Sequence, residues 1–393
     1  MRHEKTFPKK EGLIMQFLHR AWCEGWLDEY SDDHFVIRAL ENRIDTFTAF
    51  NQFSGNTVNS SGIIYSFNDF FDEGKCETFC MNLSQRLQYM SSVFGDKAIQ
   101  DFVQNQLAAG KGKYNEDSFF EALSEISVLS AIGTTLNWER ALYEPHVGES
   151  NKNPEASFLC NRMDIKDATQ EPFSVNVEVK TPRFEEIIKN QPVFIPGKLL
   201  SSEGREKLAA FCSENEIIYL APRVLKLREY INSAASKFKV ASKETFNILF
   251  INWSFRDFPD SGFYEAWSLL TNNENGILKH AESAKEIGVN PDALSKISAI
   301  VVYTEGLEGL LFGDFKYIWQ QNIHSDPHFC ACIINRDDEE LYNNNCDILL
   351  QAIGMRPSGD CPYVGLYSAY RPHRYVGKLA EIVNHYAVKY YEN

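Results

Sequence analysis

The sequence predicts an α/β (α+β) fold in which helices flank a mixed central sheet, preceded by a mostly helical N-terminal segment. The 393 residues can form one large domain or two ordinary ones, and 44% of them are hydrophobic, as in globular proteins. Helical periodicity dominates the chain up to about residue 107. Beyond residue 113 the patterns follow the order helix, strand, strand, helix, strand, helix, strand, which indicates a mixed sheet.

The N-terminal segment, residues 1–110, is expected to be mostly helical. Apolar residues recur at helical spacing in residues 11–26, 81–94 and 97–107. Residues 51–59 are rich in Asn, Ser and Gly and are expected to form a loop or a hairpin turn. The small and basic residues 108–113 predict a boundary, after which residues 111–393 form the second domain.

The second domain is expected to begin with a helix at residues 115–132. Asn115 suits its N-cap, and Glu116 and Asp117 suit the positive end of the helix dipole. Two strands are expected next, at residues 156–165 and 173–181, joined by a turn. The remaining expected elements are a helix at 224–238, strands at 246–253, 297–303 and 330–335, and a closing helix at 376–391.

The strand at residues 173–181 carries the most informative pattern in the chain. Valines alternate with polar residues there, so Glu178 and Lys180 are expected to point to the same side of the strand. Metal-dependent cleavage of a phosphodiester needs such a pair, because a carboxylate holds the divalent ion and an ammonium orients the attacking water. The alternative interpretation is an ion pair on the protein surface.

Other acids could join Glu178 if their elements converge on it. Glu125 falls within an apolar stripe of the first helix of this domain, at about 100° per residue, and its alternative is an exposed position on the helix flank. Glu155, at the start of the preceding strand, and Asp164, near its expected end, are two further candidates. A tight hairpin would place Asn161 opposite Glu178, so simple register favours neither acid.

The order and spacing of these residues resemble the PD-(D/E)xK, or restriction-endonuclease-like, nuclease superfamily. The resemblance covers about residues 115–255. It rests on the run at 120–126, on Gly133, Tyr143-Glu144-Pro145 and Pro154-Glu155, and on Val177-Glu178-Val179-Lys180. A restriction-endonuclease-like core is the fold that this resemblance implies.

The same resemblance implies a metal site in which Glu125, one acid of the second strand and Glu178 bind one or two Mg²⁺ or Mn²⁺ ions. Lys180 would then position the attacking water and stabilise the developing charge. Glu155 follows a proline, as in the superfamily, although aspartate is usual at that position. Asp164 fits the commoner short spacing to Glu178, so both acids remain candidates for the second-strand ligand.

The expected function is therefore metal-dependent hydrolysis of DNA, and the resemblance alone suggests a role in bacterial defence or restriction. One alternative is a catalytically silent member of the same fold that serves as a binding or regulatory module. Another is an unrelated α/β interaction protein in which Glu178 and Lys180 merely pair at the surface. A protein partner or a homo-oligomer is compatible with all three.

The net charge of −15 opposes indiscriminate binding to nucleic acid, so a DNA-binding protein of this composition must gather its cations on one face. The candidate phosphate-contacting residues are Lys111, Lys113, Arg228, Lys237, Arg371 and Arg374. The N-terminus is charged rather than apolar, and no stretch reaches the roughly 18 apolar residues of a membrane span. A cytoplasmic protein without a membrane partner is expected.

Overall fold

The computed structural model forms two compact units. The first comprises Met1–Asn137, Ala141–Tyr143 and Glu305–Gln321, and the second comprises Trp138–Arg140, Glu144–Thr304 and Asn322–Asn393. The structure describes residues 1–8, 15–41, 73–146, 152–161, 172–182, 193–194, 200–217, 219–220, 223–254, 264–273, 275–305, 329–333, 346, 349–350, 353, 367–368 and 376–387. The division into units does not coincide with the predicted boundary near residue 110, because the helix that follows this boundary belongs to the first unit.

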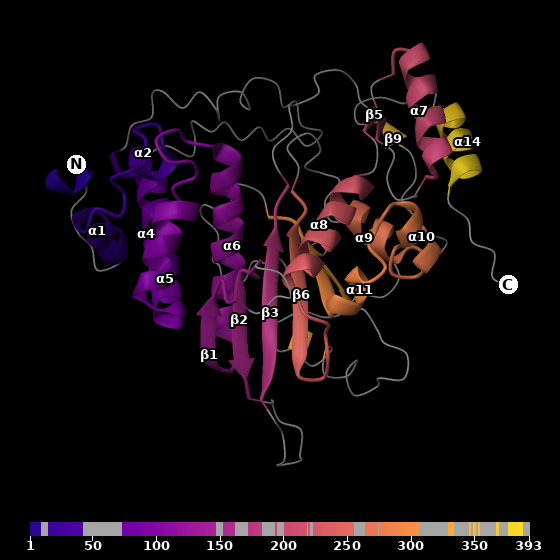
Figure 1. Cartoon of the computed structure of the whole chain (residues 1–393). Coiled ribbons are helices and arrows are strands. Elements are labelled where there is room, and N and C mark those ends of the chain that lie inside the picture. The colour runs from indigo at the N-terminus through magenta and orange to yellow at the C-terminus, as the bar shows by residue number, and fades with distance from the viewer. Residues whose placement is uncertain are drawn as a thin grey trace. The chain divides into compact units, whose positions relative to one another are not determined.

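The described part of the first unit is mainly helical, as expected for the N-terminal segment (Figure 1). Its elements are η1 (Arg2–Glu4), α1 (Gln16–Cys23), α2 (Phe35–Glu41), α4 (Glu73–Phe94), α5 (Asp96–Asp101), a π-helical turn (Phe102–Gln106) and α6 (Glu116–Thr135). Helix α4 packs against α1, α2, α5 and α6. Aromatic rings fill the core between them, as where Phe35 meets Phe79 and Phe119.

Helix α6 begins where the sequence predicts. The Asn115 side chain accepts a hydrogen bond from the backbone N–H of Ser118 at 2.9 Å, which caps the helix. Glu116 and Asp117 occupy the first turn, where the helix dipole favours negative charge. Most of its length is buried, and this explains why apolar side chains appear on nearly every face of the helix.

A mixed sheet with strand order β1-β2-β3-β6-β7-β8 forms the centre of the fold. Its strands are β1 (Trp138–Tyr143), β2 (Ala156–Cys160), β3 (Phe173–Lys180), β6 (Thr245–Asn252), β7 (Ala299–Tyr303) and β8 (Phe329–Ile333). Strand β3 is antiparallel to β2 and parallel to β6, β6 is parallel to β7, and β7 is antiparallel to β8. The predicted mixed α/β class is therefore confirmed.

The helices α8 (Val224–Lys237), α9 (Tyr264–Thr271), α10 (Ala281–Glu286) and α11 (Ala293–Lys296) lie together beside strand β6 (Figure 1). They share one apolar core with β6 and β7, to which Leu227 and Ile231 of α8, Leu249 of β6 and Ile300 of β7 contribute. Because β3 and β6 are parallel, the chain must cross over between them, and α8 lies on this crossover.

A smaller subdomain of the second unit combines a three-stranded sheet with two helices. The sheet has the order β5-β4-β9, formed by β5 (Tyr219–Leu220), β4 (Val193–Phe194) and β9 (Tyr367–Ser368). Helices α7 (Ser202–Glu214) and α14 (Val376–Tyr386) pack against each other (Figure 1) through a second apolar cluster that includes Leu208 and Val383.

Several elements differ from their predicted bounds. Strand β2 ends at Cys160 rather than at residue 165, α14 ends at Tyr386, and α1 begins at Gln16. The sequence patterns did not predict β1, α2, α7, the helices α9–α11 or the two-residue strands β4, β5 and β9. The predicted loop at residues 51–59 lies outside the described residues.

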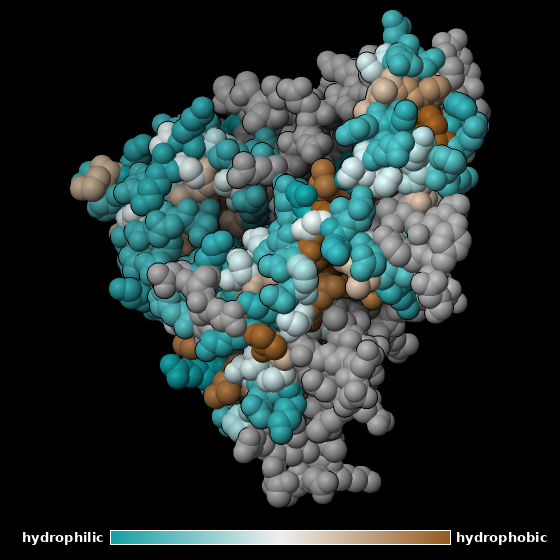
Figure 2. All heavy atoms as spheres, turned by 45° about the vertical axis from the view of Figure 1, so that its right-hand side comes forward, coloured by the Kyte–Doolittle hydropathy of each residue, from teal (hydrophilic) through white to brown (hydrophobic). Residues whose placement is uncertain are grey.

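The face of the molecule drawn in Figure 2 is mostly hydrophilic where it is described, with separate hydrophobic patches. Large hydrophobic side chains that are exposed include Leu142, Leu225 and Val240, which are far apart in the sequence. Among the described residues, no helix combines the length and the apolar character needed to cross a membrane.

Candidate functional site

Glu178 is the centre of the candidate site. It lies on β3 with 0% of its side chain exposed, and the Nζ of Lys180 is 2.6 Å from its Oε1. The two side chains therefore lie side by side, as the alternation in the sequence predicts. The burial of Glu178 argues against the alternative of an ion pair on the surface, since a carboxylate without access to water needs partners within the protein.

Glu155 reaches the same position from the neighbouring strand. The pairing of Ala156 with Val177 continues by one residue to bring Glu155 beside Glu178. The Glu155 carbonyl accepts a hydrogen bond of 2.9 Å from the backbone N–H of Glu144, which anchors the start of β2. In the observed register Cys160 pairs with Phe173, so Asn161 cannot lie opposite Glu178. The tight-hairpin register is therefore wrong.

Lys237 links the two carboxylates. Its Nζ lies 2.8 Å from Oε1 of Glu178 and 3.1 Å from Oε1 of Glu155. The Lys237 side chain is 19% exposed and that of Glu155 is 14% exposed, so the bridge is largely shielded from water. We call Glu155, Glu178, Lys180 and Lys237 the acid–lysine cluster.

Lys237 was expected to contact phosphate, and the structure instead places its ammonium against the two acids. Lys237 is the last residue of α8, and its place in the cluster depends on how α8 crosses the sheet. The apolar spacing of α8 could have given a signal, because Leu227, Ile231 and Ala234 define the buried side of the helix. No pattern in the sequence, however, identifies the carboxylates that its final turn meets.

Burial and charge act in opposite directions on the groups of the cluster. Burial raises the pKa of Glu178 and so does the negative charge of Glu155, whereas the ammonium groups of Lys180 and Lys237 lower it, and the net result is a pKa of about 7. For Lys237, burial would lower the pKa, but the charges of Glu155 and Glu178 outweigh it, and the pKa is raised. Two carboxylates and two ammonium groups thus form a nearly balanced set.

A buried ion pair fixes the beginning of α8 and so helps to position Lys237 at its end. The Glu265 carboxylate accepts hydrogen bonds from the backbone N–H of Arg223 at 2.8 Å and from its guanidinium at 2.9 Å. The indole N–H of Trp253, just after β6, donates to the same carboxylate at 3.0 Å. These bonds tie helices α8 and α9 to the end of β6.

The chemistry of the cluster fits a hard divalent ion. Carboxylate oxygens are the ligands that Mg²⁺ and Mn²⁺ prefer, and Glu155 and Glu178 supply two carboxylates. Oε2 of Glu178 is buried and has no hydrogen-bond partner among the described residues, so it is an available oxygen donor. Within the described part of the chain, however, no three acidic, His or Cys side chains are grouped to hold a metal, so the cluster supplies two ligands rather than the expected three.

The third expected ligand, Glu125, belongs to the first unit and is described there. Its side chain is buried at 9% exposure, and its Oε1 accepts a hydrogen bond from the Tyr143 hydroxyl at 2.8 Å. The alternative of an exposed position on the helix flank is therefore excluded. Asp164, the alternative ligand on the second strand, lies outside the described residues.

The remaining candidate cations for DNA contact have varied surroundings. Lys111 and Lys113 are exposed in the first unit, and Lys111 pairs with Glu29 at 2.9 Å. The Arg228 guanidinium lies 3.4 Å from the carbonyl of Ile287. Arg371 and Arg374 lie outside the described residues. A role of these residues in phosphate binding stays a prediction.

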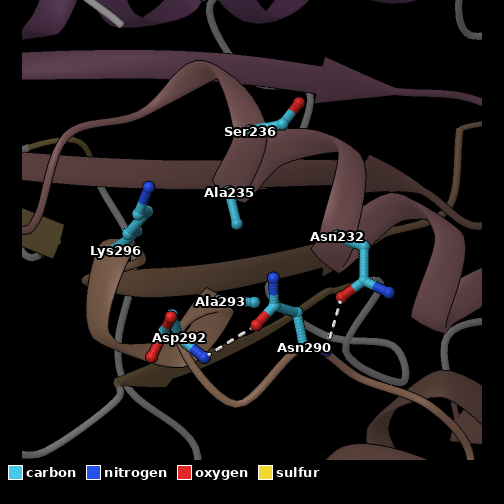
Figure 3. Close-up of a pocket in the computed structure, with 7 residues that line it drawn as sticks. All are labelled: Asn232, Ala235, Ser236, Asn290, Asp292, Ala293 and Lys296. Carbon is cyan, nitrogen blue, oxygen red and sulfur yellow. Dashed lines mark hydrogen bonds between the residues drawn. The ribbon is translucent and has the colours of Figure 1, made fainter. Parts of the chain in front are cut away.

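A pocket of about 310 Å³ lies between α8 and α11 with the segment that leads into it (Figure 3). It is lined by Asn232, Ala235, Ser236, Asn290, Asp292, Ala293 and Lys296. Asn232 accepts a hydrogen bond from the backbone N–H of Asn290 at 2.9 Å, which joins the two walls. None of the four residues of the acid–lysine cluster lines this pocket.

Comparisons with known proteins identify no relative from which a function could be transferred. No protein-family model matches the chain, and neither a curated protein nor a solved structure matches it. What the acid–lysine cluster can do must therefore be derived from its own residues.

Proposed function

We propose that this protein is a metal-dependent nuclease of the restriction-endonuclease-like fold that hydrolyses phosphodiester bonds of DNA. The observation that carries the proposal is the fully buried Glu178, with Lys180 2.6 Å away on the same strand and Glu155 joined to it through Lys237. A carboxylate pair beside a lysine, held on rigid strands, is what metal-dependent phosphodiester cleavage requires.

The order of elements supports the same proposal. With β1 present, Glu155 lies at the start of the second strand after α6, and Glu178 and Lys180 lie on the third. The helix α8 and the parallel strand β6 then follow. This is the order that the resemblance to the PD-(D/E)xK superfamily implies, with β1 as a strand that the sequence patterns did not predict.

In this proposal Glu155 and Glu178 hold Mg²⁺ or Mn²⁺. When bound, such an ion would supply Lewis-acid chemistry for the hydrolysis of a phosphodiester. Lys180, with 21% of its side chain exposed, can donate a hydrogen bond to the attacking water and stabilise negative charge as it develops. The burial of Glu178 strengthens these electrostatic interactions, because the local dielectric is lower than in water.

A second candidate function is a catalytically silent domain that binds a partner. The observation that favours it is the balance of two acids by two lysines, since such a set can persist as a structural ion cluster. Only a measurement of metal-dependent cleavage separates the two candidates.

The test is nicking of supercoiled plasmid DNA by the full-length protein in Mg²⁺, in Mn²⁺ and in EDTA. We expect cleavage with either ion and none in EDTA. Glu178→Gln and Lys180→Met should each lower the rate by at least about 100-fold. Glu244→Gln is the matched control, because Glu244 is 54% exposed and lies outside the acid–lysine cluster.

Cleavage that persists in EDTA, or that Glu178→Gln leaves unchanged, would refute the proposed function. Metal binding should survive in Lys180→Met, because a lysine is not a metal ligand. A protein that binds DNA without cleaving it under any of these conditions would favour the silent domain instead.

A further inference from the structure

Lys237 stands between the two carboxylates that the proposed function assigns to a metal ion. We propose that Lys237 is an internal competitor for that ion, whose ammonium must leave Glu155 and Glu178 before a divalent cation can bind them. This inference rests on the proposed function, since it concerns the regulation of the same site.

The distances distinguish Lys237 from the other lysine of the cluster. Its Nζ lies 2.8 Å from Glu178 and 3.1 Å from Glu155, so one ammonium contacts both acids. Lys180 contacts Oε1 of Glu178 in the cluster, and no ion pair between Lys180 and Glu155 is found among the described residues. Lys237 therefore occupies the bridging position that a cation shared by the two carboxylates would take.

The charges make simultaneous occupation unfavourable. The four side chains nearly cancel when both acids are ionised. A divalent ion added beside both ammonium groups would leave a large uncompensated positive charge in a site where three of the four side chains are less than one-fifth exposed. Moving one ammonium into water relieves this repulsion.

The position of Lys237 at the end of a helix gives its ammonium a route into solvent. It is the last residue of α8, so its flexible side chain is attached where the helix ends, and 19% of that side chain already reaches solvent. Phe238, the next residue, is fully buried and holds the backbone in place. The ammonium can therefore swing away while the end of the helix stays fixed.

The direct test is calorimetric titration of the full-length protein with Mn²⁺. Lys237→Met removes the charge and retains much of the apolar stem, and it should bind Mn²⁺ at least about tenfold more tightly than the wild type. Lys237→Arg keeps the charge and should stay close to the wild type. Lys180→Met is the matched control, because it removes one ammonium from Glu178 but leaves Lys237 between the two carboxylates. Its gain in Mn²⁺ affinity should be several times smaller.

The outcomes separate this inference from the proposed function. Unchanged or weaker Mn²⁺ binding by Lys237→Met overturns the inference, while binding and cleavage by the wild type would still support a nuclease. Binding by Lys237→Met but not by the wild type supports the competitor and contradicts a metal-dependent activity of the native chain. If neither protein binds Mn²⁺, both are overturned.

A measurement on the wild type covers the case in which Lys237→Met does not fold. The ¹⁵N resonance of the Lys237 ammonium, assigned with the Lys237→Arg variant, is followed by NMR during titration with Mg²⁺. We expect this signal to shift and its exchange with water to accelerate as the ammonium is released. A Lys237 signal that stays unchanged while Mg²⁺ binds would overturn the inference.

Discussion

Glu178 is the residue on which the electrostatics of the site depend. It is an acid with no exposed surface on a strand whose other side presents buried valines, and its charge is compensated by Lys180 and Lys237. A pKa near 7 means that protons, lysine ammonium groups and metal ions compete for the same carboxylate in neutral solution. Metal binding should therefore weaken as the pH falls below neutrality.

The raised pKa of Glu178 also predicts how stability depends on pH. The folded state binds the proton of the Glu178 carboxyl more tightly than the unfolded state, in which the pKa is near 4.5. The stabilisation of the folded state by this proton is therefore complete below pH 4.5. It is lost as the pH rises towards 7. Glu178→Gln cannot titrate, so the stability of the wild type relative to this variant should fall, by a few kcal/mol, between these values.

The measurement is urea unfolding of both proteins in EDTA, from about pH 4 to about pH 8. The carboxyl of Glu305, whose burial also raises its pKa to about 7, is present in both proteins, so its contribution cancels in the difference. A difference that stays constant with pH, or that grows in favour of the wild type as the pH rises, would contradict the raised pKa.

At the residue scale, the sequence could predict the local pair but not its surroundings. Glu178 and Lys180 are two apart on one strand, so the period of a strand places them together wherever the strand lies. Lys237 is 59 positions beyond Glu178 in the numbering, and only the course of the crossover brings them together. Glu155 depends on strand register, which the alternation of residues alone leaves open.

At the scale of elements, α7 and α14 meet at an unusually close contact. Gly204 lies in the first turn of α7, and a Cβ added there would lie 2.5 Å from Cβ of Tyr386 and 3.2 Å from its carbonyl oxygen. Neither atom is the end of a flexible side chain. The two helices can approach this closely because residue 204 has no side chain.

Gly204→Ala should therefore destabilise the protein by about 1–3 kcal/mol, because the added methyl forces the helices apart. This loss should exceed the gain of up to about 1 kcal/mol from the higher helix propensity of alanine. Gly377→Ala in α14 is the control, since a Cβ there meets no atom within 4 Å. Chemical unfolding of both variants gives the comparison, and equal stability would show that the helices do not pack as described.

The elements that could be predicted from the sequence are the long ones with a clear local signal, such as a capping residue or regular alternation. Helix α6 was predictable because Asn115 caps it and apolar residues continue for several turns. Strand β3 was predictable from its alternating valines. Strand β1 was missed because Glu139 and Arg140 interrupt its apolar residues, as suits a strand in which no residue is buried. The short helices α10 and α11, of six and four residues, are too brief for periodicity to identify them.

At the scale of the whole molecule, the net charge of −15 opposes binding to DNA, because an acidic surface repels the phosphate backbone. Of the candidate cations, Lys237 is engaged with acids of the cluster, and Lys111 pairs with Glu29. Arg228 also has an acidic neighbour, since its guanidinium lies 3.8 Å from Glu229. Contact with the DNA backbone would therefore depend mainly on Lys113 and on Arg371 and Arg374, which lie outside the described residues. A bound divalent ion would further reduce the negative potential around Glu178.

The measurement that tests the central claim most directly is a crystal structure of the full-length protein soaked in Mn²⁺, with the ion located by anomalous scattering. We expect a peak within about 2.0–2.6 Å of a Glu178 carboxylate oxygen, with Glu155 as a second ligand and the Lys237 ammonium displaced from both. The absence of any Mn²⁺ peak at Glu178, with Lys237 still bridging the two acids, would contradict the claim that this cluster is a metal centre.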